Sequence, residues 1–265
     1  MRRPGCPNSP RQRFKSRQAR YSLNSLPVHH LPASHSALAG QQWDKVTIPA
    51  SEEEHPAIRL LSPEEVFSLM EKLPSPISIA VLLVAATGLR VSEFLALRWR
   101  HVLWDKSKIS IEQVFRRGEI LNRTKTKASK APVPMCEALA TTLTEFRQQT
   151  EYSKDEDFIF ASAALRDKQP LCGQTMNAQF VKPAAIELRL ADESERFGWY
   201  RFRHSLSTWA NETTKDITVS QTMLRHAKPD TTAIYTHGNF GKALDAQRVY
   251  MEQLLRMKPA SESTQ

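Results

Sequence analysis

Five polar residues of types that suit phosphate chemistry lie at wide intervals between residues 90 and 235. They are Arg90 in TGLRVSE, Lys125 in TKTKASK, Arg203 in YRFRH, His226 in LRHA and Tyr235 in AIYTH. Attack on a phosphodiester needs a nucleophile, cations that stabilise the nonbridging oxygens, and a donor that protonates the leaving oxygen. Each short motif occurs by chance in many folds, but the set as a whole supplies all three groups.

Each of these residues has a role in such a reaction that fits its chemistry. The guanidinium groups of Arg90 and Arg203 would bind phosphate oxygens in a bidentate geometry that lysine cannot reproduce. Tyr235 would attack, and because a tyrosine ester keeps the energy of the broken phosphodiester, resealing would require neither ATP nor a metal ion. Lys125 would protonate the departing 5′ oxygen, and His226 would donate a hydrogen bond to a phosphate oxygen.

Several of these residues also have simpler explanations. Arg90 could pair with a carboxylate such as Glu93, and a histidine such as His226 is often a hydrogen-bonded part of a core. Two further lysines share the segment of Lys125, which is preferred for its offset from Val133-Pro134. The presence of all five motifs in one chain favours the catalytic interpretation.

The segments before Arg90 predict the helices that would position it. Residues 62–65 (SPEE) combine an N-cap, a proline at the first helical position and a capping-box glutamate. Residues 77–86 (ISIAVLLVAA) are apolar nearly all round, as in a central buried helix, and Thr87-Gly88 ends that helix. A third helix is expected to start near Arg90 and to carry apolar residues as far as Trp99.

The later part of the chain predicts a small sheet and more helices. Alternation at Ile109 and Ile111, the break at Gly118 and the extended residues 131–134 favour an antiparallel sheet with Lys125 on or beside its hairpin. Further helices are expected near residues 139–146, over 174–190, in two short pieces after Gly198, and over 244–255. The predicted fold class is therefore mainly α with a small antiparallel β-sheet (α+β).

The positive charge of the chain is concentrated at its start. Seven Lys and Arg residues precede the first acid, Asp44, and leave 30 basic against 28 acidic residues for the rest. This basic start could be a DNA-binding arm or have no role. Nucleic-acid contact by the rest of the chain would need a local cluster. The candidates are Arg98, Arg100 and His101, or the basic residues between Arg116 and Lys130.

Composition and periodicity divide the chain into three parts. Residues 1–59 are rich in Arg, Ser and Pro, show no sustained period and are predicted to be disordered. Residues 60–257 are predicted to form the catalytic domain. A second disordered segment is expected at residues 258–265.

No cofactor or membrane segment is expected from the sequence. The three cysteines show no C-x-x-C spacing, which favours reduced thiols over a disulfide framework or a zinc site. The eight histidines show no metal-ligand spacing with acids, and there is no Gly-rich phosphate loop. The longest apolar stretch, residues 77–86, is roughly half of the ~20 residues that cross a bilayer. A cytoplasmic protein without cofactors is therefore the expectation.

Residues 60–255 resemble the catalytic domain of tyrosine recombinases, the phage integrase family. The resemblance is carried by TGLRVSE (87–93), KTKAS with the following VP (125–134), RH (203–204), L-x-H (224–226) and TTAIYTH (231–237). It implies a mainly helical domain with a small sheet and strand exchange through a 3′-phosphotyrosyl intermediate. It also implies double-stranded DNA as a partner and a recombinase tetramer on two DNA sites, with accessory DNA-bending proteins as further candidate partners.

Two departures from the family pattern affect these expectations. Tyr200 stands three residues before Arg203, where the family usually has histidine. A phenol with a pKa near 10 is a poor proton acceptor at neutral pH, and losing acid–base help costs on the order of 10² to 10⁴ in rate, so reduced activity is expected. Only about 60 residues precede the first capped helix, where recombinases usually carry a core-binding domain, so the chain looks truncated.

These observations favour a site-specific recombinase or integrase whose catalytic residues are Arg90, Lys125, Tyr200, Arg203, His226 and Tyr235. A truncated, noncatalytic DNA-binding relic or regulator of a mobile element is the alternative. A type IB topoisomerase would use the same chemistry, but the local motifs are closer to integrases.

Overall fold

The structure is a computed structural model, and it describes residues 59–122, 132–165, 168–225 and 237–256. All of these residues belong to one compact unit of the chain. The disorder expected for residues 1–59 and 258–265 falls outside the described residues, apart from residue 59. None of the helices in the described ranges is long and apolar enough to cross a membrane.

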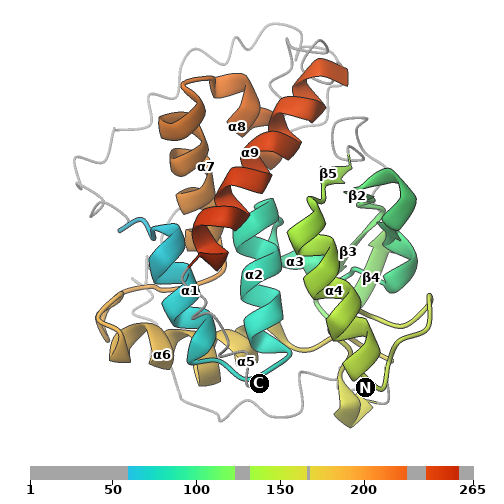
Figure 1. Cartoon of the computed structure of the whole chain (residues 1–265). Helices are drawn as coiled ribbons and strands as arrows, with labels where there is room; N and C mark the ends of the chain where they lie inside the picture. The colour runs from blue at the N-terminus through green and yellow to red at the C-terminus, as the bar shows by residue number, and fades with distance from the viewer. Residues whose placement is uncertain (1–58, 123–131, 166–167, 226–236, 257–265) are drawn as a thin grey trace, which may run out of the picture. The chain divides into compact units, whose positions relative to one another are not determined.

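The described elements are mostly helical, with short strands (Figure 1). The α-helices are α1 (Pro63–Glu71), α2 (Ile77–Thr87), α3 (Val91–Phe94), α4 (Glu137–Gln149), α5 (Gly173–Met176), α6 (Lys182–Glu187), α7 (Tyr200–Thr214), α8 (Ile217–Leu224) and α9 (His237–Leu255). The strands are β1 (Val102–Leu103), β2 (Lys108–Ile109), β3 (Gln113–Arg116), β4 (Glu119–Asn122) and β5 (Val133–Pro134). Short helical turns are η1 (Trp99–His101), η2 (Trp104–Lys106) and η4 (Ala163–Leu165), all 3₁₀, and the π-helical η5 (Asn177–Val181). The predicted fold class is confirmed.

The first helix begins as its sequence predicts. Ser62 Oγ accepts from the Glu65 N–H at 3.2 Å, and Glu65 Oε2 accepts from the Ser62 N–H at 3.0 Å. These reciprocal bonds form a capping box and satisfy two donors that the helix start leaves open.

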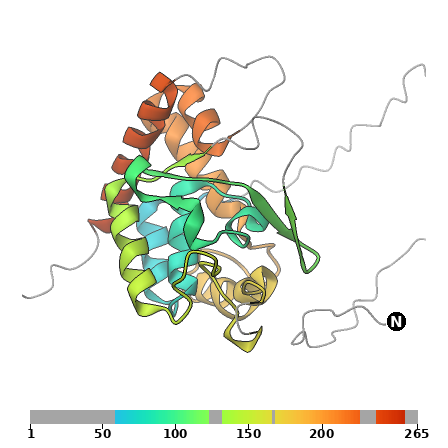
Figure 2. The same ribbon diagram turned by 90° about the vertical axis from the view of Figure 1, so that its right-hand side faces the viewer.

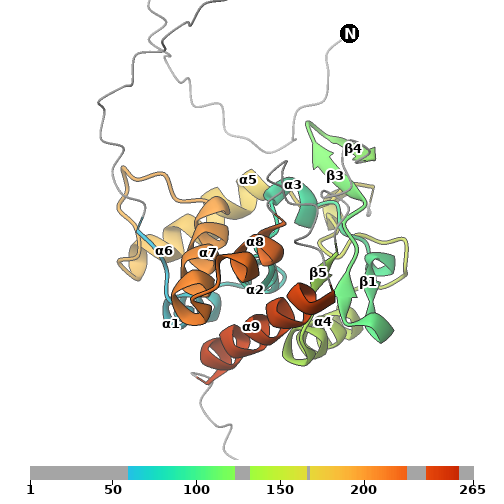
Figure 3. The ribbon, with the colours of Figure 1, turned by 90° about the horizontal axis from the view of Figure 1, so that it is seen from above.

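Helix α2 is the centre of the hydrophobic core. It is buried along nearly its whole length, and it contacts α1, α4, α7 and α9. Figures 1 and 3 show these helices around it. A helix that is apolar on all sides is stable only in such surroundings, so the sequence predicts this position directly.

The prediction of a third helix that carries Trp99 is wrong. Helix α3 ends at Phe94, and the next two turns are tightened by bonds from Ala96 N–H to Glu93 O and from Leu97 N–H to Phe94 O. The chain then pairs with a distant segment, because Arg98 and Phe158 form a β-bridge. Tertiary pairing therefore ends a helix that the apolar period alone would continue.

The predicted sheet is present as two separate pieces. One has the order β1-β2-β5, in which Ile109 of β2 is paired with Val102 on one side and Val133 on the other. The other is the β3–β4 hairpin, which turns at Arg117 and Gly118 with φ of 52° and 85°. The strands lie to one side of the helices. Figure 2 is viewed from this side and shows the β3–β4 hairpin extending away from the rest of the fold.

The helix predicted over residues 174–190 is present but interrupted. Helices α5 and α6 continue into each other through the π turn η5. Pro183 lies in the first turn of α6 and has no N–H to donate to the preceding turn. A wider π turn before a proline accommodates this missing hydrogen bond.

Helix α9, the last described helix, packs back on the first helix and on the middle of the chain. It begins at His237, earlier than the predicted residue 244, and packs on α1, α4 and α8. Its buried Gln247 donates to the carbonyls of Ala86 and Pro134, at 3.0 Å and 2.9 Å, and accepts from the Cys136 N–H at 2.7 Å. One side chain therefore ties α9 to α2, β5 and the start of α4.

Candidate active site

Arg90 lies where α2 ends and α3 begins. Gly88 ends α2 with φ of 62°, and a Cβ atom there would overlap Cδ2 of Leu224. Arg90 is the N-cap of α3: its N–H donates to Glu93 Oε2, and its Nη1 donates to Glu93 Oε1, both at 3.1 Å. Since 42% of its side chain is exposed, Arg90 is anchored and yet accessible.

A pocket of about 560 Å³ lies between Arg90 and the β3–β4 hairpin. Its lining includes Ser92 and Glu93 of α3 and the exposed Arg116 and Arg117 at the end of the hairpin. Three guanidinium groups around one pocket, against a single carboxylate, suit an anion such as a phosphate.

Arg203 reaches the same junction from α7. It is buried, and it donates through Nη1 to Gly88 O and through Nη2 to Leu224 O, the latter at 2.6 Å. Burial, followed by the positive charge of Arg90, lowers the pKa of Arg203 to about 10. The group therefore stays protonated at neutral pH, and the structure places its charge within electrostatic reach of Arg90.

Arg225 is a charged residue of this junction that the sequence interpretation missed. Its Nη2 forms an ion pair with Glu93 Oε2, and neither side chain is exposed. The motif L-x-H treats residue 225 as variable, but an arginine at the end of a helix, directly before His226, was a usable signal. Glu93, which the sequence suggested only as a partner of Arg90, thus holds two arginines.

Tyr200 begins α7, one turn before Arg203. The residue is 66% solvent-exposed, and its ring meets that of His204 edge-on with centroids 6.0 Å apart. Tyr200 also contributes to the electrostatic environment of Arg203. Its position therefore leaves the phenol open to a bound molecule.

Three of the predicted site residues, Lys125, His226 and Tyr235, lie outside the described residues. Lys125 belongs to the segment that joins β4 to β5, and the other two belong to the segment that joins α8 to α9. The structure brings Arg90, Arg203 and Tyr200 to one junction, and the roles of the remaining three stay predictions.

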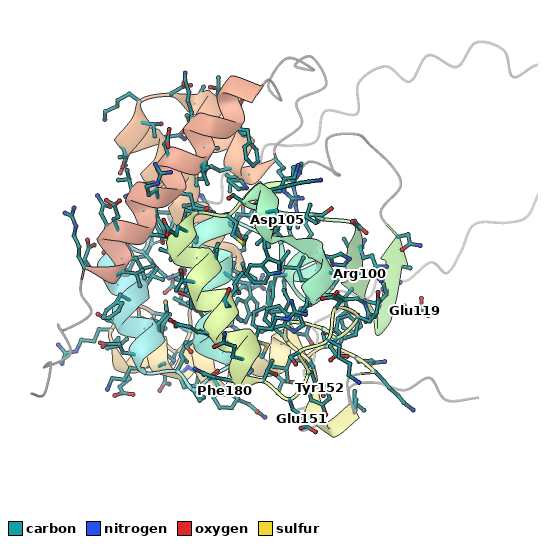
Figure 4. All side chains as sticks on the ribbon, turned by 45° about the vertical axis from the view of Figure 1, so that its right-hand side comes forward. Arg100, Asp105, Glu119, Glu151, Tyr152 and Phe180 are labelled. Carbon is teal, nitrogen blue, oxygen red and sulfur yellow. The ribbon has the colours of Figure 1, made fainter. Side chains whose placement is uncertain are left out.

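The first basic cluster suggested by the sequence is largely occupied within the protein. The Arg98 guanidinium lies 4.0 Å from the Phe158 ring centroid and donates to Glu156 O. Arg100, labelled in Figure 4, pairs with the Glu156 carboxylate, and His101 is buried. Arg116 and Arg117 on the hairpin are therefore the better candidates for contact with an anion.

The described residues offer no arrangement for a metal ion. Within residues 59–122, 132–165, 168–225 and 237–256, no group of three His, Cys, Asp or Glu side chains is placed to hold one. In the described part of the junction, the groups that could bind a phosphate are the cationic side chains that line the pocket.

Comparison with known proteins finds solved structures that share this fold and curated relatives of two kinds. Tyrosine recombinase XerA of Pyrococcus furiosus is 27% identical over 183 residues, which are 66% of this chain and 56% of that protein. Transposase B from transposon Tn554 of Staphylococcus aureus is 26% identical over 215 residues, which are 76% of this chain and 32% of the transposase. The chain thus spans about half of the first relative and about a third of the second.

Among solved structures, the Tn1549 transposon integrase in complex with transposon right end DNA is similar, with a TM-score of 0.55 at 18% identity. The match covers 77% of this chain and 68% of the integrase, and at this identity it establishes the fold. Residues 59–242, well over half of the chain, match the phage integrase family. This protein is therefore a member of the phage integrase family.

Proposed function

We propose that this protein is a site-specific DNA recombinase that breaks and rejoins DNA through a 3′-phosphotyrosyl intermediate. Arg90 and Arg203 bind the scissile phosphate, Tyr235 is the nucleophile, Lys125 is the general acid and His226 assists at a phosphate oxygen. Tyr200 is a weakened partner in the acid–base chemistry. The catalytic domain spans residues 60–257.

The observation that carries this proposal is the meeting of Arg90 and Arg203 at one junction. The two residues come from different helices, and the charge of Arg90 acts on the pKa of Arg203. Like charges are held together in proteins at a cost in free energy, which a bound anion reverses. The pocket beside Arg90 adds two more guanidinium groups where DNA phosphates would lie.

The proposed reaction conserves the phosphodiester energy. The phenol of Tyr235 releases its proton to water as its oxygen forms a bond to phosphorus, while the bond to the 5′ oxygen breaks and Lys125 gives that oxygen a proton. Rejoining reverses the step, with a 5′ hydroxyl attacking and Tyr235 leaving. Arg90 and Arg203 stabilise the charge on the nonbridging oxygens in both directions.

Duplex DNA is the proposed partner, and a tetramer on two DNA sites is the proposed assembly. The similar Tn1549 integrase was solved with transposon right end DNA, and the relatives named XerA and Tn554 transposase act in recombination and transposition by name. In this chain the cationic lining of the pocket supports the DNA partner.

Covalent capture tests the proposal. The purified protein is incubated with nicked suicide duplexes that carry the DNA flanking its own gene, and denaturing gels then detect a protein–DNA adduct. We expect an adduct with the natural sequence and none with Tyr235→Phe, while DNA binding is unchanged because only one hydroxyl is lost. Tyr152→Phe, which changes a tyrosine away from the junction, is the matched control and should give the full adduct yield.

The other outcomes discriminate the alternatives. An adduct that persists in Tyr235→Phe would show that another residue is the nucleophile. DNA binding without any adduct would favour a noncatalytic DNA-binding relic or regulator. Relaxation of any supercoiled plasmid, without a need for a defined site, would favour a topoisomerase.

A further inference from the structure

Arg225 has an unusual backbone conformation for a buried arginine. It ends α8 with φ of 53° and ψ of 44°, in the left-handed region that favours glycine. The described residues with positive φ that are not glycine are Ser107, Arg117, Arg189, Lys215 and Arg225. Of these five, Arg225 alone is buried, so its side chain is kept in the protein at the cost of backbone strain.

The Arg225 side chain reaches a carboxylate that also holds Arg90. Glu93 is fully buried, and its two oxygens have separate tasks. Oε1 accepts from Arg90 Nη1, whereas Oε2 accepts from the Arg90 N–H and pairs with Arg225 Nη2. A buried carboxylate therefore bridges the end of α8 and the start of α3.

The charges of this arrangement explain why a second cation is useful. A buried carboxylate is stable only if it is paired, and without Arg225 the remaining ion pair of Glu93 among the described residues would be the one with Arg90. Arg90 would then be drawn toward Glu93 and away from solvent, where a phosphate binds. With Arg225 on Oε2, the described contacts of the Arg90 guanidinium to Glu93 use Nη1 only, and 42% of the side chain stays exposed.

We propose that Arg225 is a positioning residue, which acts through Glu93 to hold the Arg90 guanidinium toward the scissile phosphate. The inference rests on the proposed function, since it assigns Arg90 to that phosphate. It also links the end of α8, directly before His226, to the residue that begins α3. Arg203, which donates to Leu224 O, anchors the same helix end from α7.

Single-turnover cleavage of the suicide duplex at saturating DNA measures this effect. We expect Arg225→Gly to slow adduct formation about 10- to 100-fold, the size of effect that a misplaced catalytic group produces, with the Kd for DNA unchanged within about threefold. Lys215→Gly is the matched control, because Lys215 ends α7 with the same φ of 53° and is exposed. It changes the backbone in the same way and should leave the cleavage rate unchanged.

A double-mutant cycle tests whether Arg225 acts through Glu93. In a Glu93→Gln background, the carboxylate that links the two arginines is gone, so Arg225→Gly should slow cleavage less than about threefold further. If the fold decreases in cleavage rate caused by the two substitutions instead multiply, Arg225 does not act through Glu93 and the inference is overturned. A normal cleavage rate in Arg225→Gly alone would overturn it as well.

A spectroscopic measurement keeps the inference testable apart from activity. The Nε–Hε NMR signal of Arg90, assigned with Arg90→Lys, should shift and broaden in Arg225→Gly and stay unchanged in Lys215→Gly. If Arg225→Gly alters the Arg90 signal but the natural sequence forms no adduct, Arg225 does hold the Arg90 side chain through Glu93, and it is the proposed function that is rejected. An unaltered Arg90 signal, with an adduct in the natural sequence, would reject the positioning role and leave the function standing.

Discussion

The three arginines around Glu93 differ in what surrounds them, and this separates their uses. Arg90 is partly exposed and lines the pocket, whereas Arg203 is buried with its two Nη groups on backbone carbonyls. Arg225 is buried and forms an ion pair with the Glu93 carboxylate. Arg90 is therefore the group most accessible to a phosphate, and Arg203 would need to exchange carbonyl partners for phosphate oxygens or act through its charge.

At Tyr200 we predict that histidine raises activity. Tyr200 is 66% exposed, so Tyr200→His should fold normally. A histidine accepts and donates protons near neutral pH, and its gain should be about 10- to 100-fold in single-turnover cleavage, with a pH profile that bends near 6.5. Tyr200→Asn provides polarity without acid–base chemistry and should show no gain. If both variants cleave alike, acid–base help at this position does not limit the rate.

At Gly88 we predict a loss of stability that exceeds backbone strain. Gly88→Ala introduces a Cβ atom at φ of 62° that overlaps the buried Leu224 side chain. The left-handed conformation costs about 1 kcal/mol, and crowding in a packed core adds about 1 to 3 kcal/mol. Gly118→Ala has a similar φ of 85° but open space around it, so it should show only the strain. Urea unfolding of both variants measures the difference, and equal losses would mean that Leu224 moves aside freely.

At the scale of elements, α9 depends on one polar side chain in an apolar core. Gln247 is fully buried and serves three backbone groups from three different elements. Leaving a backbone group without a hydrogen-bond partner inside a core costs more free energy than the hydrogen bond itself contributes. The packing of α9 on α2 and β5 is thus specified by polar as well as apolar contacts.

We therefore predict that Gln247→Met, which keeps the length of the side chain, destabilises the protein by about 2 to 4 kcal/mol. Gln253→Met on the same helix is the control, because Gln253 is partly exposed and accepts one bond, from Trp209 Nε1 at 2.9 Å. Gln253→Met should lower the free energy of unfolding by about 1 kcal/mol. Thermal unfolding of the two variants gives the comparison, and similar losses would argue against the bridging role of Gln247.

How well each element was predicted depends on how local its determinants are. The capping box at residues 62–65 and the apolar helix α2 are encoded by neighbouring residues, and both were correct. The end of α3 was wrong because it is set by pairing of Arg98 with Phe158, far along the chain. The division of the strands into two sheets also depends on long-range partners, which a pattern of alternation cannot identify.

The same limit applies to the candidate site. Arg90 and Arg203 were found through local motifs, and in the structure the charge of Arg90 acts on Arg203. Arg225 was missed because its partner, Glu93, lies 132 residues away. A charged residue at the variable position of the L-x-H motif does not by itself reveal what its side chain contacts. Gln247 was missed for the same reason, since its value lies in three partners that only the folded chain supplies.

At the scale of the whole molecule, one buried histidine couples folding to pH. His101 Nδ1 accepts from the Arg98 N–H at 3.0 Å, so the neutral ring carries its proton on Nε2. Arg100 Nε, 3.4 Å from Nε2, is then a second donor facing a donor and contributes no hydrogen bond. Glu112 Oε2 is 3.7 Å from Nε2 and favours the charged ring only weakly by comparison with burial.

Burial, with the nearby Arg100 and Arg98 charges, lowers the pKa of His101 below its ordinary value of 6.5, while Glu112 and Glu156 oppose the shift. Near pH 6.5 the His101 imidazole is therefore protonated in the unfolded chain while it is still neutral in the folded protein. Stability is fully present above about pH 6.5 and is lost as the pH falls from there toward the lower folded pKa. The loss is at most about 1.4 kcal/mol per pH unit for one proton.

We predict that His101→Asn removes this part of the pH dependence. The Asn side-chain oxygen can accept from the Arg98 N–H in place of Nδ1, and it does not titrate between pH 5 and 8. Urea unfolding at pH 7.5 and pH 5.5 should show the natural protein losing more free energy of unfolding than the variant over this interval. Carboxylates titrate in both proteins and cancel in the difference. The same loss in both proteins would mean that His101 is protonated in the folded state despite its burial, and that its charge is compensated by Glu112.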